Sequence, residues 1–321
     1  MTIHFILSGE TLESIAEEIH LENPEYLKEF HNTYCAREDF IYEALIPGKK
    51  LLIPDSGKIR AYNSRNDASF KQPKLNPEIP FHPENFSRIF SVVNKETEDN
   101  GLEEKSNTLT YTVSLKWLRK EENYHLFQIF KNNFSEGNGS MMADLAAESI
   151  RSLNPVEVKT DLKGDIVQVS LPEETLKNFG KIKERLIDLF PDEYAKIYLD
   201  EFESAVLDQR LFNSRMKEDI FIKTYFAAFR NRFENGKSFL KQSAGEENIH
   251  LDIQQQVESP DYDHEMLLLQ AVIPTSNHDR DFIGKYRVDS ASGMVKEIEI
   301  RYAISLFGVK NSSFLTVTEL S

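Results

Sequence analysis

Few residues in this sequence have types and spacing suited to covalent chemistry. The single cysteine, Cys35, lies one helical turn after His31, a spacing at which an imidazole could activate a thiol as a nucleophile. A lone thiol on a short helix is more often an inert and partly buried side chain. We therefore expect no cysteine-dependent catalysis.

Two local groups combine histidine with carboxylates. His264 precedes Glu265, and His278 lies close to Asp279 and Asp281. Neither group has the His-Glu-x-x-His spacing that holds zinc on a helix, and the second lies in a polar stretch typical of a solvated turn. We expect no metal site.

Other catalytic classes lack a signature. The 13 glycines are scattered, and no phosphate-binding glycine motif occurs. A glycosidase needs two carboxylates at a defined separation, and 53 acidic residues supply many accidental pairs without selecting one. The sequence predicts a protein that is not an enzyme and that uses no cofactor.

Length and charge limit the remaining possibilities. A chain of 321 residues suggests two or three domains, and its net charge of −15 disfavours nucleic acid as a partner. The first residues lack the basic segment of a secretory signal, and no apolar run is long enough to span a membrane. We expect a cytoplasmic protein with no membrane insertion. The alternative is delivery to the periplasm or cell wall by a route that reads no cleavable signal.

The first 55 residues have a regular pattern of elements. Residues 3–7 form a short apolar run typical of a strand, and Leu12, Ile15, Ala16 and Ile19 have the spacing of one helical face. Pro24 favours the start of a second helix, and residues 51–53 form a closing strand. The predicted order is strand, helix, helix, strand.

The segments "HFILSGETLESIAEEI", "YLKEFHN" and "LIPGKKLLIP" resemble a LysM module over residues 1–55. Modules of this family usually bind N-acetylglucosamine polymers such as peptidoglycan or chitin, in a shallow groove between two loops. The resemblance implies a glycan-binding groove made by one loop with Gly9, Glu10, Thr11 and Leu12 and a second loop with Leu45, Ile46, Pro47 and Gly48.

A second interpretation of the same module is protein docking. His4 stands where the family usually has an aromatic residue, and residues 1–55 carry eleven Asp and Glu against four Lys and Arg. LysM modules without export signals resemble those of contractile injection machines, including phage tails and type VI secretion. The alternative function is therefore a cytoplasmic adaptor or assembly component of such a machine.

The rest of the chain indicates a linker and a larger domain. Four prolines between Pro73 and Pro83, followed by the polar run Asn94–Asn107, favour a semi-rigid spacer with a domain boundary near residue 75. Strict alternation predicts a strand over residues 109–117, and aromatic spacing predicts a helix over residues 217–233.

These patterns predict an α+β fold. It comprises a LysM-like βααβ module at residues 1–55, a proline-rich linker at 56–75, and an α+β domain at 76–321 whose antiparallel sheet is interrupted by a helical block. The predicted function is non-catalytic binding of peptidoglycan or another N-acetylglucosamine polymer. The ligand of the larger domain is not indicated by any motif.

Overall fold

A computed structural model describes residues 2–36, 39–42, 44–65, 73–135, 140–234, 236–244, 249–259, 261–273, 280–306 and 308–320. The chain divides into two compact units, one formed by Met1–Pro77 with Phe233–Lys237 and the other by Glu78–Arg232 with Ser238–Ser321. We call them unit 1 and unit 2 and describe each by itself.

The described part of unit 1 contains two short strands and three helices. In chain order they are β1 (Thr2–Phe5), α1 (Leu12–Glu18), α2 (Pro24–Tyr34), β2 (Lys50–Ile53) and α3 (Ser56–Asn63), followed by a short 3-10 turn at Pro73–Leu75. β1 and β2 pair antiparallel, with Thr2 opposite Ile53 and Phe5 opposite Lys50. The core lies between this pair and the helices and includes Ile15, Leu27, Phe30 and Leu51.

Helix α3 lies in the segment that the sequence predicts to be a linker. Asp55 caps it by accepting hydrogen bonds from the N–H groups of Gly57 and Lys58. Its Tyr62 is buried and stacks on Tyr26 of α2, with ring centroids 5.2 Å apart. Residues 56–63 therefore add to the core of unit 1.

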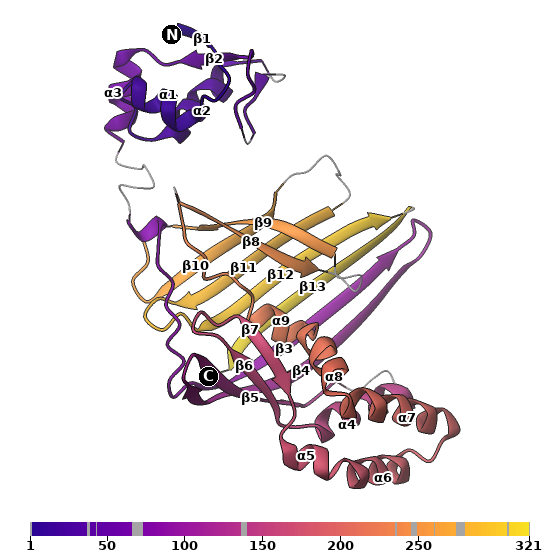
Figure 1. Cartoon of the computed structure of the whole chain (residues 1–321). Helices are drawn as coiled ribbons and strands as arrows, with labels where there is room; N and C mark the ends of the chain where they lie inside the picture. The colour runs from indigo at the N-terminus through magenta and orange to yellow at the C-terminus, as the bar shows by residue number, and fades with distance from the viewer. Residues whose placement is uncertain are drawn as a thin grey trace. The chain divides into compact units, whose positions relative to one another are not determined.

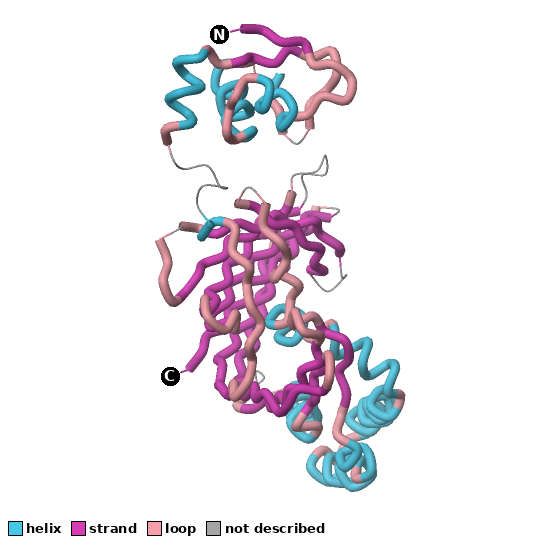
Figure 2. The backbone as a smooth tube through the Cα atoms, turned by 60° about the vertical axis from the view of Figure 1, so that its left-hand side comes forward, coloured by secondary structure: helices cyan, strands magenta, loops and turns pink. Residues whose placement is uncertain are grey.

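Unit 2 is built on one antiparallel sheet (Figures 1 and 2). The strand order is β7-β6-β5-β4-β3-β13-β12-β11-β10-β9-β8. The strands are β3 (Ser87–Asp99), β4 (Glu104–Glu121), β5 (Tyr124–Asn132), β6 (Val156–Thr160), β7 (Ile166–Ser170), β8 (Lys237–Ala244), β9 (Ile249–Val257), β10 (Glu265–Val272), β11 (Arg280–Asp289), β12 (Val295–Leu306) and β13 (Val309–Leu320).

The helices of unit 2 precede and follow β6 and β7. They are α4 (Met141–Ser152), α5 (Glu173–Lys177), α6 (Phe179–Leu189), α7 (Glu193–Leu207), α8 (Gln209–Lys217) and α9 (Ile220–Tyr225). Helices α4, α6 and α7 share a small core of their own that contains Leu145, Leu186, Ala195 and Leu199. Figure 1 shows these three helices grouped at one end of the sheet, whereas α9 lies against the sheet itself.

The predicted fold class is wrong. We expected an α+β chain whose sheet is interrupted by a helical block, and the structure is mostly one antiparallel sheet of 11 strands. The strands before and after the helices join because β3 pairs with β13, from Ile89 opposite Leu320 to Asp99 opposite Lys310. This pairing joins segments that are far apart in sequence, so local hydrophobic periodicity does not predict it.

The polar run at 94–107 is also not a spacer. It forms the end of the β3–β4 hairpin, where Asn94 pairs with Leu109 and Asp99 with Glu104. Both faces of this end are largely exposed, which explains why its sequence is polar. The exposed end of the β3–β4 hairpin is therefore as polar as a linker would be, and composition alone does not distinguish the two.

Aromatic side chains in the core of unit 2 hold α9 on the sheet. Phe221 and Tyr225 of α9 pack against Phe90 of β3, and Phe229 packs against Tyr286 of β11. The Tyr225 hydroxyl donates to the Val295 carbonyl oxygen at 3.2 Å. These contacts fix α9 and the residues after it on one face of the sheet.

Among the described residues, no helix is both long and apolar enough to cross a lipid bilayer.

Candidate functional site

The two loops predicted to form a groove lie side by side in unit 1. The Ile6 N–H donates to the Lys49 carbonyl oxygen at 3.0 Å, and the Gly48 N–H donates to the Ile6 carbonyl oxygen at 2.8 Å. The turn after β1 therefore begins where the turn before β2 ends. This backbone contact brings together the two halves of the predicted site.

The first loop is ordered by its own side chains. Gly9 has a φ of +91°, a conformation that favours glycine. Thr11 caps α1 through a capping box, in which its Oγ1 accepts from the Ser14 N–H and the Ser14 Oγ accepts from the Thr11 N–H. The loop therefore has a defined shape without a ligand.

Glu10 is held by one partner in this loop and one in β1. Its Oε2 accepts from the Leu7 N–H at 2.7 Å and lies 2.8 Å from His4 Nε2. The Leu7 hydrogen bond is the largest cause that holds the pKa of Glu10 below its ordinary value, followed by the hydrogen bond with His4. Glu10 is thus an ionised carboxylate that fixes the turn.

The second loop is a tight turn with an open outer side. The Lys49 N–H donates to the Ile46 carbonyl oxygen at 3.2 Å, and Gly48 has a φ of +84°. A side chain added at Gly9 or Gly48 would meet no atom within 4 Å. Both glycines therefore face open space.

The eight predicted groove residues separate into two groups. Gly9, Thr11, Ile46, Pro47 and Gly48 are exposed, whereas Glu10, Leu12 and Leu45 are partly buried. Leu12 and Leu45 pack against the core of unit 1. These two leucines support the loops from below, and a ligand would meet the exposed residues and the backbone.

The segment before the second loop is fixed by Asn32. Its side chain accepts from the Ile41 N–H and donates to the Ile41 carbonyl oxygen, each at 2.9 Å. Tyr42 follows with 71% of its surface exposed. Arg37, Glu38 and Glu43 of the same segment lie outside the described residues.

Cys35 and His31 do not form a catalytic pair. Both ring nitrogens of His31 are engaged, since Nδ1 accepts from the Leu52 N–H and Nε2 lies 2.8 Å from the Asp39 carbonyl oxygen. Burial raises the pKa of the Cys35 thiol, and the charge of Asp39 adds to this effect. The imidazole is structural, and the thiol is disfavoured as a thiolate.

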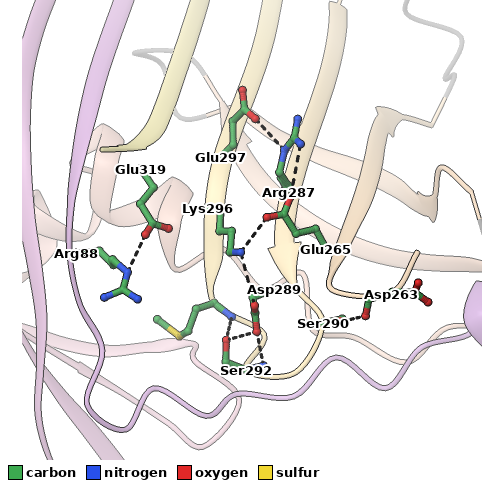
Figure 3. Close-up of polar contacts among 11 residues, drawn as sticks. Arg88, Asp263, Glu265, Arg287, Asp289, Ser290, Ser292, Lys296, Glu297 and Glu319 are labelled. Carbon is green, nitrogen blue, oxygen red and sulfur yellow. Dashed lines mark hydrogen bonds and ion pairs between the residues drawn. The ribbon is translucent and has the colours of Figure 1, made fainter. Parts of the chain in front are cut away.

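The carboxylate of Glu265 is also occupied (Figure 3). It lies 2.9 Å from Lys296 Nζ and 3.6 Å from an Arg287 nitrogen, and the Lys296 hydrogen bond is the main cause that lowers its pKa. In the part of the chain that is described, no group of three or more His, Cys, Asp or Glu side chains could hold a metal ion. His278 and Asp279 lie outside that part, and Asp281 lies in β11.

Arg230 is a notable residue that the sequence analysis did not single out. Its guanidinium carbon lies 4.5 Å from the Phe81 ring centre and 4.2 Å from that of Phe229. Nη2 donates to the Gly293 carbonyl oxygen at 2.7 Å, whereas Nε and Nη1 are buried without a hydrogen-bond partner among the described residues. Burial lowers its pKa to about 10, so it remains a cation at neutral pH. No sequence motif marks such a stacked arginine.

Comparisons with known proteins add little about function. No protein-family model matches the sequence, and no curated protein matches it. A lipovitellin structure described as showing lipid–protein interactions is similar at 12% identity and a TM-score of 0.41, over 73% of this chain and 25% of that one.

Two bacterial structures are also similar over 73% of this chain. One is a putative outer membrane lipoprotein-sorting protein domain from Vibrio parahaemolyticus, with 11% identity, a TM-score of 0.19 and 86% of that chain covered. The other is a DUF1329 family protein from Desulfovibrio piger, with 11% identity, a TM-score of 0.22 and 88% covered. All three TM-scores are below 0.5.

Proposed function

We propose that residues 1–55 form a binding module for N-acetylglucosamine polymers such as peptidoglycan, and that the protein binds this glycan without chemically changing it. The observation that carries the proposal is the hydrogen bond from the Gly48 N–H to the Ile6 carbonyl oxygen. It brings the two loops that resemble a LysM groove to one place on unit 1.

The chemistry of the two loops suits a neutral sugar chain. Ile46 and Pro47 offer an exposed apolar surface against which the C–H face of a pyranose ring can pack, and Ile46 has 56% of its surface exposed. The other loop supplies polar groups, the Thr11 hydroxyl and the Glu10 carboxylate. Because both loops are ordered by internal hydrogen bonds, binding would cost little loop entropy.

The residues of the two loops support binding of the glycan rather than its hydrolysis. Glu10 is the one carboxylate among the eight predicted groove residues, and its low pKa makes it a poor proton donor. Hydrolysis of a glycosidic bond needs a second carboxyl group with a raised pKa. The eight residues contain no such partner.

Calorimetric titration of the full chain with chitin oligomers of increasing length tests the proposal. We expect saturable binding that strengthens with length and that is lost in Ile46→Asp. The matched control is Tyr34→Asp, because Tyr34 is also exposed, at 54%, but lies at the end of α2. No heat of binding to chitin or to soluble peptidoglycan fragments would reject the proposal and favour the adaptor function.

A further inference from the structure

Strand β1 has an open edge. Within the described residues of unit 1, β1 and β2 are the strands of the sheet, and β1 has no other neighbour. The hydrogen bonds of Ile6 with Lys49 and Gly48 set the alternation of the ladder, so the backbone groups of Thr2 and His4 face β2. The N–H and C=O groups of Ile3 and Phe5 then point away from β2, toward the free edge.

Neighbouring contacts agree with this alternation. The Leu7 N–H, next in the same series, is turned away from β2 and donates to Glu10 Oε2. On the far side of the sheet, the Leu52 N–H of β2 donates to His31 Nδ1 at 3.0 Å. His31 therefore occupies part of the β2 edge, whereas no described residue pairs with the outer edge of β1.

The side chains beside the open edge are apolar. Ile3, Phe5 and Leu7 alternate along the chain, so they share the outer face of the sheet, with 52%, 57% and 62% of their surfaces exposed. Natural edge strands are usually protected by lysine, proline or a bulge. β1 reads Thr-Ile-His-Phe and has none of these.

The size of this surface limits its occupant. The three side chains expose on the order of 100 Å² each. A stable protein–protein interface buries about 800 Å² on each partner. The row is too small to hold two copies of the chain together by itself, so a single added strand is the occupant that suits it.

We propose that β1 accepts an extended segment of another protein as a third strand, in which apolar residues alternate with basic ones. The backbone groups of Ile3 and Phe5 would supply the hydrogen bonds, and the partner's apolar side chains would pack beside Ile3, Phe5 and Leu7. Basic residues are favoured because residues 1–55 contain eleven Asp and Glu against four Lys and Arg. Ile3 and Phe5 are not among the eight predicted groove residues, so variants at these two positions test the strand site apart from the glycan loops.

The test uses the full chain and a fluorescent peptide in which valine and lysine alternate. Fluorescence anisotropy measures binding, and hydrogen exchange of residues 2–7 locates it. We expect the peptide to bind and to slow amide exchange at Ile3 and Phe5. A peptide of the same sequence with alternate backbone nitrogens methylated should bind at least about tenfold more weakly, because it cannot complete the ladder.

Two variants of the chain complete the test. Ile3→Pro removes an outward N–H that takes no part in the β1–β2 ladder, so unit 1 should stay folded and peptide affinity should fall about tenfold. Phe5→Lys should also weaken binding, whereas the control Tyr34→Lys should not.

Three results would overturn the inference. One is equal affinity for the methylated peptide, which would show attraction by charge alone. Another is the absence of binding to the folded wild-type chain. The third is a dimer in sedimentation equilibrium that Ile3→Pro abolishes, which would show that a second copy covers β1.

Discussion

The His4 imidazole and the Glu10 carboxylate lie 2.8 Å apart, from Nε2 to Oε2, and join β1 to the loop of the proposed glycan site. His4 occupies a position at which the sequence differs from the usual LysM pattern. Its contact with Glu10 links that difference to the loop of the proposed site. The loop is held by this hydrogen-bonded pair, and replacing either His4 or Glu10 alone would break it.

Glu10 should titrate at an unusually low pH. Its pKa is lowered from an ordinary value of 4.5, so its contribution to stability is fully present above that pH and is lost as the pH falls through the folded pKa. The chemical shift of the Leu7 amide reports this titration directly. We expect a midpoint below 4.5 in the wild type and a higher midpoint in His4→Gln. An unshifted midpoint in the wild type would contradict the geometry of the loop.

The Asn32 side chain should stabilise unit 1 more than the side chain of Thr33 does. Asn32→Ala leaves the buried Ile41 backbone without two hydrogen bonds, which we expect to lower the free energy of unfolding by about 2 kcal/mol. Hydrogen exchange of the α2 amides measures this change. Thr33→Ala is the control, because the exposed Thr33 hydroxyl bonds within its own helix. Equal effects of the two substitutions would argue against the Asn32 contact.

Cys35 should react slowly with thiol reagents in the native chain. Burial raises its pKa above the ordinary 9.0, so less thiolate is present than in an unfolded chain at the same pH. Reaction with a disulfide reagent, followed with and without denaturant, measures the difference. Faster reaction in the native state would restore Cys35 as a candidate nucleophile.

Arg230 should be important for the stability of unit 2. Arg230→Ala removes a guanidinium stacked on two rings, with an expected loss of about 3 kcal/mol. Arg230→Lys keeps the charge but not the planar group, so most of the loss should persist. Urea unfolding followed by the fluorescence of Trp117, the single tryptophan, measures both variants. The control is Arg301→Ala, where an exposed arginine over Phe314 should contribute less than about 1 kcal/mol.

Local elements of this fold can be predicted, but their long-range pairing cannot. Alternation from Leu109 to Trp117 predicts a strand, and these residues lie within β4. The pairing of β3 with β13 depends on residues at the two ends of unit 2, which periodicity in a short window does not relate.

The helix predicted over residues 217–233 shows a second limit. Helix α9 ends at Tyr225, although Phe229 and Phe233 continue the helical spacing. The backbone after α9 forms hydrogen bonds outside a helix: the buried Gln255 side chain donates to the Phe229 carbonyl oxygen at 2.8 Å. A tertiary hydrogen bond of this kind leaves no trace in the local sequence.

In the candidate site, too, some features can be predicted from the sequence and others depend on the folded structure. The glycines and Pro47 of the two loops are visible in the sequence as turn residues. The inward packing of Leu12 and Leu45 and the open edge of β1 depend on the folded unit. Residue type therefore indicates where the loops lie, and the structure indicates which side chains can meet a ligand.

Glycine-selective NMR of the full chain shows whether the two loops of unit 1 bind a glycan. A chain labelled with ¹⁵N-glycine gives signals from 13 glycines, and Pro47–Gly48 is the one Pro-Gly pair, which assigns Gly48 by labelling the proline carbonyl. On titration with chitin oligomers, we predict saturable shifts of the Gly9 and Gly48 signals that grow with oligomer length, while the signals of the unit 2 glycines do not shift. Unmoved Gly9 and Gly48 signals at saturating sugar would contradict it.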